Sequence, residues 1–311
     1  MREIRDVLIV GVGAVGSSIA SIIHDREPGA VSVLAGPGRA ARFRERGFVL
    51  NGRRYDFPVA EVGSRAERDL VIVAVKGHQL ARAIEDMRSQ VGPSTLVLSL
   101  LNGITSEDEL AAAFGRGRVP YAMILGIDAV REGNSTDFAF SGAIRFGEAR
   151  NPPGAWSENV SRIASFFDRT GVRHEVPEDM IRALWYKFMI NVGVNQASAL
   201  LRATYASFQR LPEARRVMEA AMREVVELSR AMGTGLVPAD LEAWRETLSR
   251  MGPGTKTSML QDVEAGRKTE VEAFAGTVVE LGRRAGLATP VNALLFDMLR
   301  AVERAYLGEA G

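Results

Sequence analysis

Residues 10–16 read Val10-Gly11-Val12-Gly13-Ala14-Val15-Gly16 and join a run of apolar residues to a segment with helical patterning. In such a G-x-G-x-x-G turn, the first glycine permits a tight turn, the second lets the backbone approach a pyrophosphate, and the third allows a helix to pack closely on a strand. The following helix N-terminus offers free N–H groups and a partial positive charge to phosphates. The stretch Gly11–Gly16 is therefore predicted to bind a dinucleotide; a glycine-rich turn without a ligand is the alternative.

Short apolar runs alternate with helical stretches through the first half of the chain. The runs rich in β-branched residues are predicted to be strands buried on both faces, as in a parallel sheet: Asp6–Val10, Val31–Leu34, Asp69–Val75 and Ser94–Leu100. Between them, 14–26, 38–46 and 77–90 have helical patterning and complete repeated βαβ units. Extended stretches near 119–127 and 138–147, a helix around 155–169 and a short strand over 172–176 follow. We expect a Rossmann-like α/β domain with a mostly parallel sheet over residues 1–176.

The second half has a different character, because no convincing strand is found from Pro177 onward. The segments with helical patterning are 178–201, 212–232, 238–250, 256–265, 269–285 and 290–307. Glycines at 233, 252 and 286 interrupt them. We therefore expect an all-α domain over residues 177–311 to follow the α/β domain.

The composition excludes several classes of function. The net charge is +1 with acids and bases interleaved, so there is no electrostatic case for binding nucleic acid or an anionic membrane. The absence of cysteine removes disulfides, thiolate metal sites and cysteine nucleophiles, and the three histidines are far apart, so no metal site is expected. No apolar stretch reaches the length of a membrane span, and the N-terminal residues do not form a signal peptide. A cytoplasmic, reduced location is expected.

The region after the second predicted strand indicates which nicotinamide cofactor is used. An NAD-selective site usually has an acidic residue about 20 residues beyond the glycines, where it holds the ribose 2′-hydroxyl. No Asp or Glu occurs from 28 through 44, and Arg39, Arg42 and Arg44 lie nearby to pair with a 2′-phosphate. NADP(H) is therefore favoured, with Arg39 as the candidate phosphate ligand; a solvated helix face is the alternative for each arginine.

Polar residues follow the third and fourth predicted strands. Lys76 comes after the third strand and Asn102-Gly103 after the fourth. Because ligands bind at the carboxyl ends of strands in open α/β sheets, Lys76 and Asn102 are expected on the cofactor side of the site. The alternatives are a helix start for Lys76 and a simple turn for Asn-Gly.

Lysine is rare in this chain. Of the 39 basic residues only four are lysine: Lys76, Lys187, Lys256 and Lys268. Lys187 stands inside the apolar run 183–191, where a solvated charge does not belong. A carbonyl that accepts a hydride needs a proton on its oxygen, and with no cysteine and no well-placed histidine, lysine is the natural acid.

Lys187, Asn191 and Asn195 are spaced i, i+4, i+8, so on a helix they lie along one face. Burying these groups without partners would cost about 1–3 kcal/mol each. The stripe must therefore face solvent or line a polar cleft. The apolar content of the remaining faces favours the cleft.

The segment 256–270 carries further candidates. Gly266 is expected to end one helix and Thr269 to cap the next, which makes Glu270 a first-turn acid and favours its ionised form. Helix capping alone would explain this pattern. The functional interpretation is that an ionised Glu270 near Lys187 holds the amine protonated, and that Ser258, a small donor at a helix start, holds a substrate carboxylate.

In order and spacing, these motifs resemble the ketopantoate reductase (2-dehydropantoate 2-reductase) family over nearly the whole chain. The features that carry the resemblance are Gly11–Gly16, Lys76, Asn102-Gly103, Trp185-Tyr-Lys187 with Asn191 and Asn195, Ser258–Asp262, Thr269-Glu270 and Gly286–Asn292. The resemblance implies NADPH-dependent reduction of the ketone of 2-dehydropantoate to (R)-pantoate, a step toward pantothenate and coenzyme A.

The resemblance also implies a role for each position. Lys187 would be the general acid and Glu270 the carboxylate paired with it. Asn191, Asn195 and Ser258 would bind the substrate, and Lys76 and Asn102 would lie at the cofactor side. Two alternatives stay open: reduction of a different small 2-oxo or 3-oxo acid, and a non-catalytic NADP-binding sensor. The oligomeric state is not fixed, and a homodimer is one option.

Overall fold

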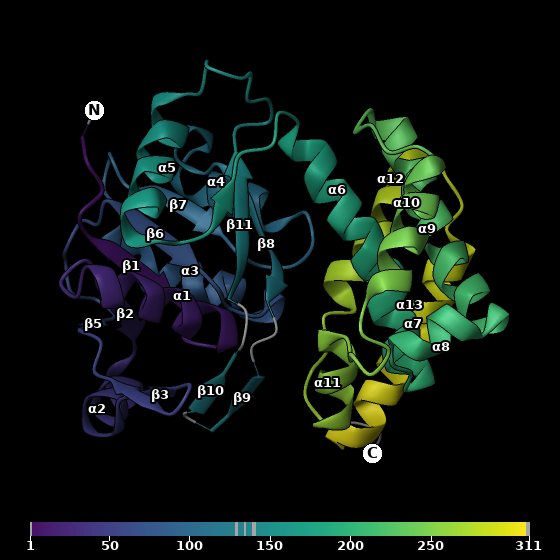
Figure 1. Ribbon diagram of the computed structural model, residues 1–311, viewed down its shortest axis with the longest axis horizontal. Coiled ribbons are helices and arrows are strands. Elements are labelled where there is room, and N and C mark those ends of the chain that lie inside the picture. Colours follow the sequence, from purple (N-terminus) through teal and green to yellow (C-terminus); the bar gives the residue numbers. More distant parts are fainter. Residues whose placement is uncertain (1, 128–129, 134, 139–140, 309–311) are drawn as a thin grey trace. The chain divides into compact units, whose positions relative to one another are not determined.

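The computed structural model describes residues 2–127, 130–133, 135–138 and 141–308. The chain divides into two compact units (Figure 1). The first comprises Met1–Leu101 and Thr105–Ile181, and the second comprises Asn102–Ile104 and Arg182–Gly311. Residues 139–140, which fall within the predicted extended stretch 138–147, lie outside the described residues.

A five-stranded sheet with the order β5-β2-β1-β6-β7 forms the centre of the first unit. Its strands are β1 (Val7–Val10), β2 (Val31–Ala35), β5 (Val59–Glu61), β6 (Leu70–Val73) and β7 (Leu96–Ser99). Every pairing within it is parallel. The chain runs outward from β1 to β2 and β5, and β6 and β7 then lie on the other side of β1. The predicted Rossmann-like parallel sheet is confirmed, although the three-residue edge strand β5 was not predicted.

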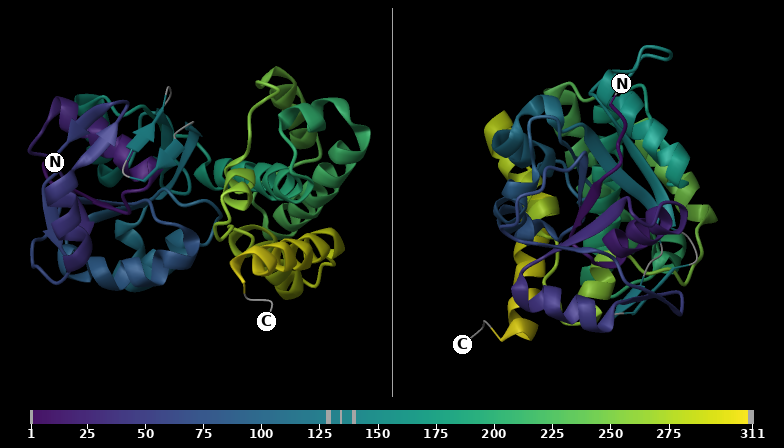
Figure 2. Two further views of the ribbon diagram at one scale, coloured as in Figure 1. Left: turned by 90° about the horizontal axis from the view of Figure 1, so that it is seen from below. Right: turned by 90° about the vertical axis from the view of Figure 1, so that its left-hand side faces the viewer.

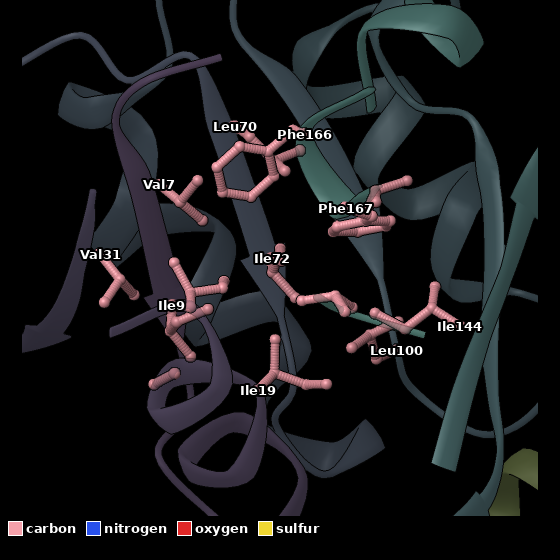
Figure 3. Close-up of a cluster of buried hydrophobic side chains, with 14 of the residues drawn as sticks. Val7, Ile9, Ile19, Val31, Leu70, Ile72, Leu100, Ile144, Phe166 and Phe167 are labelled. Atoms are coloured by element: carbon pink, nitrogen blue, oxygen red, sulfur yellow. The ribbon is translucent and has the colours of Figure 1, made fainter. Parts of the chain in front are cut away.

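Alternate side chains of this sheet enter two different cores, as expected for strands buried on both faces. On one face the strands pack with α1 (Ala14–Arg26) and α5 (Glu158–Thr170). Figure 3 shows this cluster, which includes Val7, Ile9, Ile19, Val31, Leu70, Ile72, Phe166 and Phe167. On the other face they pack with α3 (Leu80–Met87) and α4 (Ser106–Phe114). That second cluster includes Leu8, Val10, Val71, Val73, Leu80, Ile84 and Leu110.

Two smaller sheets complete the first unit. The sheet β4-β3-β10-β9 contains β3 (Phe48–Leu50), β4 (Arg53–Tyr55), β9 (Val130–Glu132) and β10 (Ser135–Asp137). The sheet β12-β11-β8 contains β8 (Tyr121–Ile127), β11 (Ser141–Gly147) and β12 (His174–Glu175). The remaining helical elements are α2 (Pro37–Arg46), η1 (Gly77–Gln79), η2 (Arg88–Gln90) and η3 (Arg116–Arg118). The sequence did not predict α4 or the strands of the first small sheet, which are three residues long and too short to show a period.

A buried carboxyl group follows β7 in the first unit. Glu107 is 3% exposed, and its carboxylate oxygens accept hydrogen bonds from the Ser106 hydroxyl at 2.9 Å and from the Ala122 backbone N–H at 3.3 Å. Ser106 also shares a 2.7 Å hydrogen bond with Ser99 of β7. Burial raises the pKa of Glu107 from 4.5 to about 6, because these hydrogen bonds only partly offset the lost solvation.

We expect this carboxyl to make the folded protein less stable as the pH rises from about 4.5 to 6. In that window the folded state binds more protons than the unfolded state, so the free energy of unfolding falls, by about 2 kcal/mol in total. Glu107→Gln stays neutral throughout and should lack this component. Urea unfolding of both proteins at several pH values from 4 to 7 measures the difference. Parallel pH curves for the two proteins would contradict the expectation.

The second unit is built from helices, drawn in green to yellow in the left view of Figure 2. Among the described residues from 182 to 308, every regular element is helical, which confirms the predicted change of character. Its α-helices are α6 (Met180–Ile190), α7 (Gln196–Leu201), α8 (Tyr205–Arg210), α9 (Pro212–Met232), α10 (Ala239–Arg250), α11 (Ser258–Glu264), α12 (Thr277–Ala285) and α13 (Pro290–Leu307). The helix α8 was not predicted.

Two π turns interrupt segments that the sequence predicted as continuous helices. The turn η4 (Asn191–Asn195) lies between α6 and α7, and η5 (Glu272–Gly276) leads into α12. Such turns are rare and are often found at functional sites. Within the described part of the chain, no helix is both long and apolar enough to cross a membrane.

Candidate active site

The three motif glycines of the turn after β1 have three different surroundings. Gly11 has φ +98°, and a Cβ there would stand 2.7 Å from the carbonyl oxygen of Ala74. A Cβ on Gly16 would overlap the carbonyl oxygen of Gly11. At Gly13, by contrast, no atom of the described residues lies within 4 Å of the Cβ position. Gly11 and Gly16 are thus closely packed against neighbouring backbone, while the space beside Gly13 is open, as a turn that receives a pyrophosphate requires.

The helix that follows this turn begins at Ala14, with Gly13 as its N-cap. The first N–H groups of a helix have no partner within the helix, and the first turn of α1 contains no acidic side chain to oppose an anion. Lys76 follows β6, which is the parallel neighbour of β1. The glycine turn and Lys76 therefore come from the carboxyl ends of adjacent strands, and these residues fit a dinucleotide.

An acidic residue that the sequence did not reveal lies beside the end of β2. Glu61, at the end of β5, pairs in register with Ala35, the last residue of β2. Its carboxylate accepts a 2.6 Å hydrogen bond from Arg44. Arg39, the candidate 2′-phosphate ligand, is exposed in the first turn of α2. Glu61 was missed because only strand pairing brings residue 61 beside residue 35.

In the second unit, one amide joins the predicted acid to the predicted carboxylate. The Lys187 ammonium on α6 donates a 3.0 Å hydrogen bond to Oδ1 of Asn102. Nδ2 of Asn102 donates a 3.0 Å hydrogen bond to Oε2 of Glu270. The structure thus brings together three of the predicted residues, and it places Asn102, expected on the cofactor side, between the two predicted catalytic groups.

The loop that carries Asn102 approaches the helical segment after Glu270 closely. Gly103 has φ +97°, and a Cβ on it would stand 3.4 Å from the Ala273 carbonyl oxygen. This positive φ favours glycine, because a side chain would be strained there. The Asn-Gly pair therefore lets the amide of Asn102 reach Glu270.

The backbone before Glu270 is held by a carboxylate of α13. The backbone N–H and the hydroxyl of Thr269 donate to the Glu303 carboxylate at 2.7 and 2.6 Å. The N-cap of the π turn η5 is Val271, two residues beyond the predicted cap Thr269. The Thr269 hydroxyl still accepts a 3.4 Å hydrogen bond from the Val271 backbone N–H. The contact of the Thr269 hydroxyl with Glu303 is the shorter of its two hydrogen bonds, and Glu303 is buried at 8% exposure. Gly266 has φ +61° just beyond the end of α11, as expected.

The two predicted substrate-side asparagines lie on η4. Nδ2 of Asn195 is 3.5 Å from Oδ1 of Asn191, so both side chains share a face of this turn. Nδ2 of Asn191 is buried and has no hydrogen-bond partner among the described residues. A buried donor of this kind is costly unless a further acceptor satisfies it. Ser258, also predicted to bind substrate, is the exposed first residue of α11, and Thr257 before it is the N-cap.

The chemistry that these groups can perform is proton transfer and anion binding. Lys187 offers an ammonium whose position is set by Asn102, while Asn191 offers an unused amide donor. The described residues contain no group of three or more metal-ligating side chains that could hold a metal ion. A glycine turn that fits a dinucleotide and a lysine–amide–carboxylate cluster that can transfer a proton are the two parts that a dinucleotide-dependent oxidoreductase requires.

The family follows from comparison with known proteins. The family model described as ketopantoate reductase PanE/ApbA matches residues 7–151, and the model of the C-terminal part of that family matches residues 179–303. The chain belongs to the ketopantoate reductase family.

Relatives match along almost their whole length. The 2-dehydropantoate 2-reductase of Halobacterium salinarum is 30% identical over 305 residues, which cover 96% of this chain and 99% of the relative. That of Aquifex aeolicus is 26% identical over 307 residues, covering 95% and 96%. Among solved structures, D-mandelate dehydrogenase with NADH and anilino(oxo)acetate shares the fold at a TM-score of 0.87, with 21% identity over 97% of this chain and 99% of that chain. A ketopantoate reductase from Ralstonia eutropha gives 0.82, with 24% identity over 97% and 99%.

Proposed function

We propose that this protein reduces 2-dehydropantoate to (R)-pantoate with NADPH. The observation that carries the proposal is the Asn102 amide, which binds the Lys187 ammonium with its oxygen and the Glu270 carboxylate with its nitrogen. An ammonium held in this way is a proton donor of fixed position. The relatives named 2-dehydropantoate 2-reductase support the choice of substrate.

Each residue of the cluster has a defined part in the proposed reaction. When bound, the reduced nicotinamide supplies a hydride to the ketone carbon of the substrate. Lys187 donates a proton from Nζ to the ketone oxygen as negative charge develops there. Asn102 orients the ammonium, and Glu270 fixes the Asn102 amide by accepting from Nδ2.

The substrate carboxylate and hydroxyl need donors and acceptors outside this cluster. We assign these roles to Asn191, Asn195 and Ser258. The buried Nδ2 of Asn191 supports the assignment, because a substrate oxygen would provide the acceptor that it lacks among the described residues. Residues 1–176 would then serve mainly as the cofactor domain and 177–311 as the substrate domain. Asn102–Ile104, although within the first range, would contribute to the substrate domain.

The cofactor is a nicotinamide dinucleotide held by Gly11, Gly13, Gly16 and the N-terminus of α1, with Lys76 at the neighbouring strand end. We assign NADPH rather than NADH because Arg39 is exposed in the first turn of α2. Glu61, the acid nearest in register to the end of β2, is already paired with Arg44.

Replacing Arg39 by alanine is expected to raise KM for NADPH by about tenfold or more and to leave KM for NADH unchanged. A charge-assisted hydrogen bond to a phosphate contributes about 1.5–3 kcal/mol, and only NADPH carries the 2′-phosphate. Arg42→Ala, on the same helix and also exposed, is the control. Steady-state kinetics with both cofactors gives the result. An unchanged NADPH preference in the Arg39 variant would assign the phosphate to another residue.

The substrate is tested with purified enzyme, NADPH and a panel of oxo acids that includes 2-dehydropantoate and phenylglyoxylate. The highest kcat/KM is expected with 2-dehydropantoate. A preference for phenylglyoxylate would favour a different 2-oxo acid, an alternative raised by the likeness in fold to D-mandelate dehydrogenase. Cofactor binding without turnover of any oxo acid would indicate the non-catalytic sensor.

A further inference from the structure

Gln196, the first residue of α7, is fully buried directly after the two substrate-side asparagines. Its side-chain nitrogen Nε2 donates a 2.7 Å hydrogen bond to the carbonyl of Val192, within the π turn η4. Its oxygen Oε1 accepts a 3.1 Å hydrogen bond from the backbone N–H of Ala275, within the π turn η5. One side chain therefore connects both widened turns of the second unit.

The π geometry explains why Ala275 needs this partner. In an α-helix the N–H of Ala275 would donate to the carbonyl of Val271. In η5 that carbonyl accepts instead from Gly276, at 3.0 Å. The N–H of Ala275 is thus displaced from the usual helical pattern, and Oε1 of Gln196 satisfies it. Leaving a buried N–H without a partner would be strongly unfavourable.

The orientation of the Gln196 amide is fixed from both sides. Ala275 N–H can only donate and the Val192 carbonyl can only accept, so a flipped amide would satisfy neither. Behind it, Oδ1 of Asn292 lies 3.3 Å from Nε2 of Gln196. The Asn292 amide is itself set by α9, because its Nδ2 donates to Glu224 at 2.7 Å and to the Ala221 carbonyl at 3.2 Å.

The first of these turns carries the two substrate-side asparagines, and the second follows Glu270 closely in the chain. The turn η4 bears Asn191 and Asn195, and it is pressed against α9, where a Cβ on Gly193 would stand 2.5 Å from Met222. The turn η5 begins two residues after Glu270, whose carbonyl accepts hydrogen bonds from the backbone N–H groups of Ala273 and Phe274 at 3.0 and 3.2 Å. The distance between the asparagines and the carboxylate therefore depends on how the two turns are joined.

We propose that Gln196 is a positioning residue that locks the two π turns together. It thereby fixes the relative positions of Asn191, Asn195 and Glu270 that binding and reduction of the oxo acid require. This inference rests on the proposed function. In this proposal Gln196 takes no direct part in the transfer of the hydride or the proton. It acts through its hydrogen bonds to the backbone of both turns. A misplacement of about 1 Å far from the chemistry can cost about 10²-fold in rate.

The test is Gln196→Met, which keeps the length of the side chain and removes all three hydrogen bonds of the amide, to Val192, Ala275 and Asn292. We expect kcat/KM for the oxo acid to fall by about 10–100-fold, with a higher KM for the oxo acid and an unchanged Kd for NADPH. Hydrogen exchange in 272–276 should also accelerate, because the N–H of Ala275 loses its acceptor. Gln196→Glu keeps an acceptor for Ala275, but an ionised carboxylate cannot donate to the Val192 carbonyl or to Asn292. The link to η4 is then lost, and KM for the oxo acid is expected to rise in this variant too.

The matched control is Gln209→Met. Nε2 of Gln209 likewise donates two hydrogen bonds within the second unit, here to the backbone carbonyls of Leu248 at 2.8 Å and Met251 at 2.9 Å. A merely structural loss would lower the active fraction equally in both variants and leave KM for the oxo acid unchanged. Wild-type KM and kcat in folded Gln196→Met, or in Gln196→Glu if the first variant does not fold, would overturn the proposal.

The outcomes for the proposed function and for Gln196 are separable. Wild-type enzyme that turns over no oxo acid would refute the proposed function. In that case the hydrogen-exchange measurement still decides whether Gln196 locks the turns. Unchanged exchange at 272–276 in both Gln196 variants would refute the lock itself.

Discussion

Lys187→Ala is expected to lower kcat for reduction of the oxo acid by about 10²–10⁴-fold while NADPH still binds. General acid catalysis by one positioned side chain typically contributes a factor of this size. Lys187 has its ammonium 3.0 Å from Oδ1 of Asn102, and this contact lies in the second unit, whereas the glycine turn lies in the first. Steady-state kinetics, together with a cofactor titration followed by fluorescence, separates the two effects.

Two further variants make the result specific. Lys256→Ala removes an exposed lysine that pairs with Glu264 at 2.8 Å, and a surface pair of this kind contributes about 0–1 kcal/mol to stability, so wild-type turnover is expected. Lys187→Arg keeps the charge, but a guanidinium cannot be deprotonated in proteins, so kcat should stay low. Wild-type turnover in Lys187→Ala would remove this residue from the mechanism, and full activity in Lys187→Arg would indicate charge binding instead of proton donation.

Gly16→Ala and Gly13→Ala are both expected to lose cofactor binding, but for different reasons. A Cβ on Gly16 would overlap the backbone oxygen of Gly11, so the turn or α1 must move. Overpacking of this kind costs about 1–3 kcal/mol or more, which lowers Tm by several degrees and removes the cofactor site. Gly13 has φ −78° and an open Cβ position, so alanine fits the backbone and should leave Tm unchanged or slightly higher.

The Gly13 variant should nevertheless lose the cofactor, because the added methyl group occupies the space that a pyrophosphate would approach. Thermal unfolding with and without NADPH tests both expectations. Wild type at 100 times Kd should gain about 2.7 kcal/mol of stability from the cofactor, and both variants should gain far less. A full NADPH-induced rise of Tm in Gly13→Ala would show that the phosphates do not approach this glycine.

The parallel sheet could be predicted because its signals are local. Strands such as β1 and β6 are apolar runs buried on both faces, and the glycine turn is contiguous in the chain. Three-residue strands such as β5 and β9 carry no usable period. The same limit hid Glu61, whose place beside Ala35 depends on strand pairing alone.

The members of the proposed catalytic cluster, Lys187, Asn102 and Glu270, could be named from the sequence, but the way they are joined could not. Asn102 is 85 residues from Lys187 and 168 residues from Glu270. No spacing rule covers such separations, so Asn102 was assigned to the cofactor side. The i, i+4 spacing of Lys187, Asn191 and Asn195 predicted a common face, which the 3.5 Å contact between the two asparagines supports.

The two π turns could not be predicted from local sequence patterns for a related reason. Their widened backbone depends on partners from other segments: Gln196 for Ala275 of η5, and α9 for Gly193 of η4. A pattern of apolar residues has nearly the same appearance in an α-helix and in a helix with one π turn. The N-cap was placed at Thr269 instead of Val271 for the same reason, since the carboxylate that holds Thr269 belongs to Glu303, 34 residues further along the chain.

The assignment of Asn102–Ile104 to the second unit has a practical consequence for dissecting the gene. A fragment encoding only residues 182–311 would contain Lys187 and Glu270 but would lack the amide that binds both. Expressing the two halves separately would therefore separate Asn102 from Lys187 and Glu270 even if each half folded. A split version of this enzyme would need the tripeptide Asn102–Ile104 added to the helical fragment, or the two fragments reassembled noncovalently.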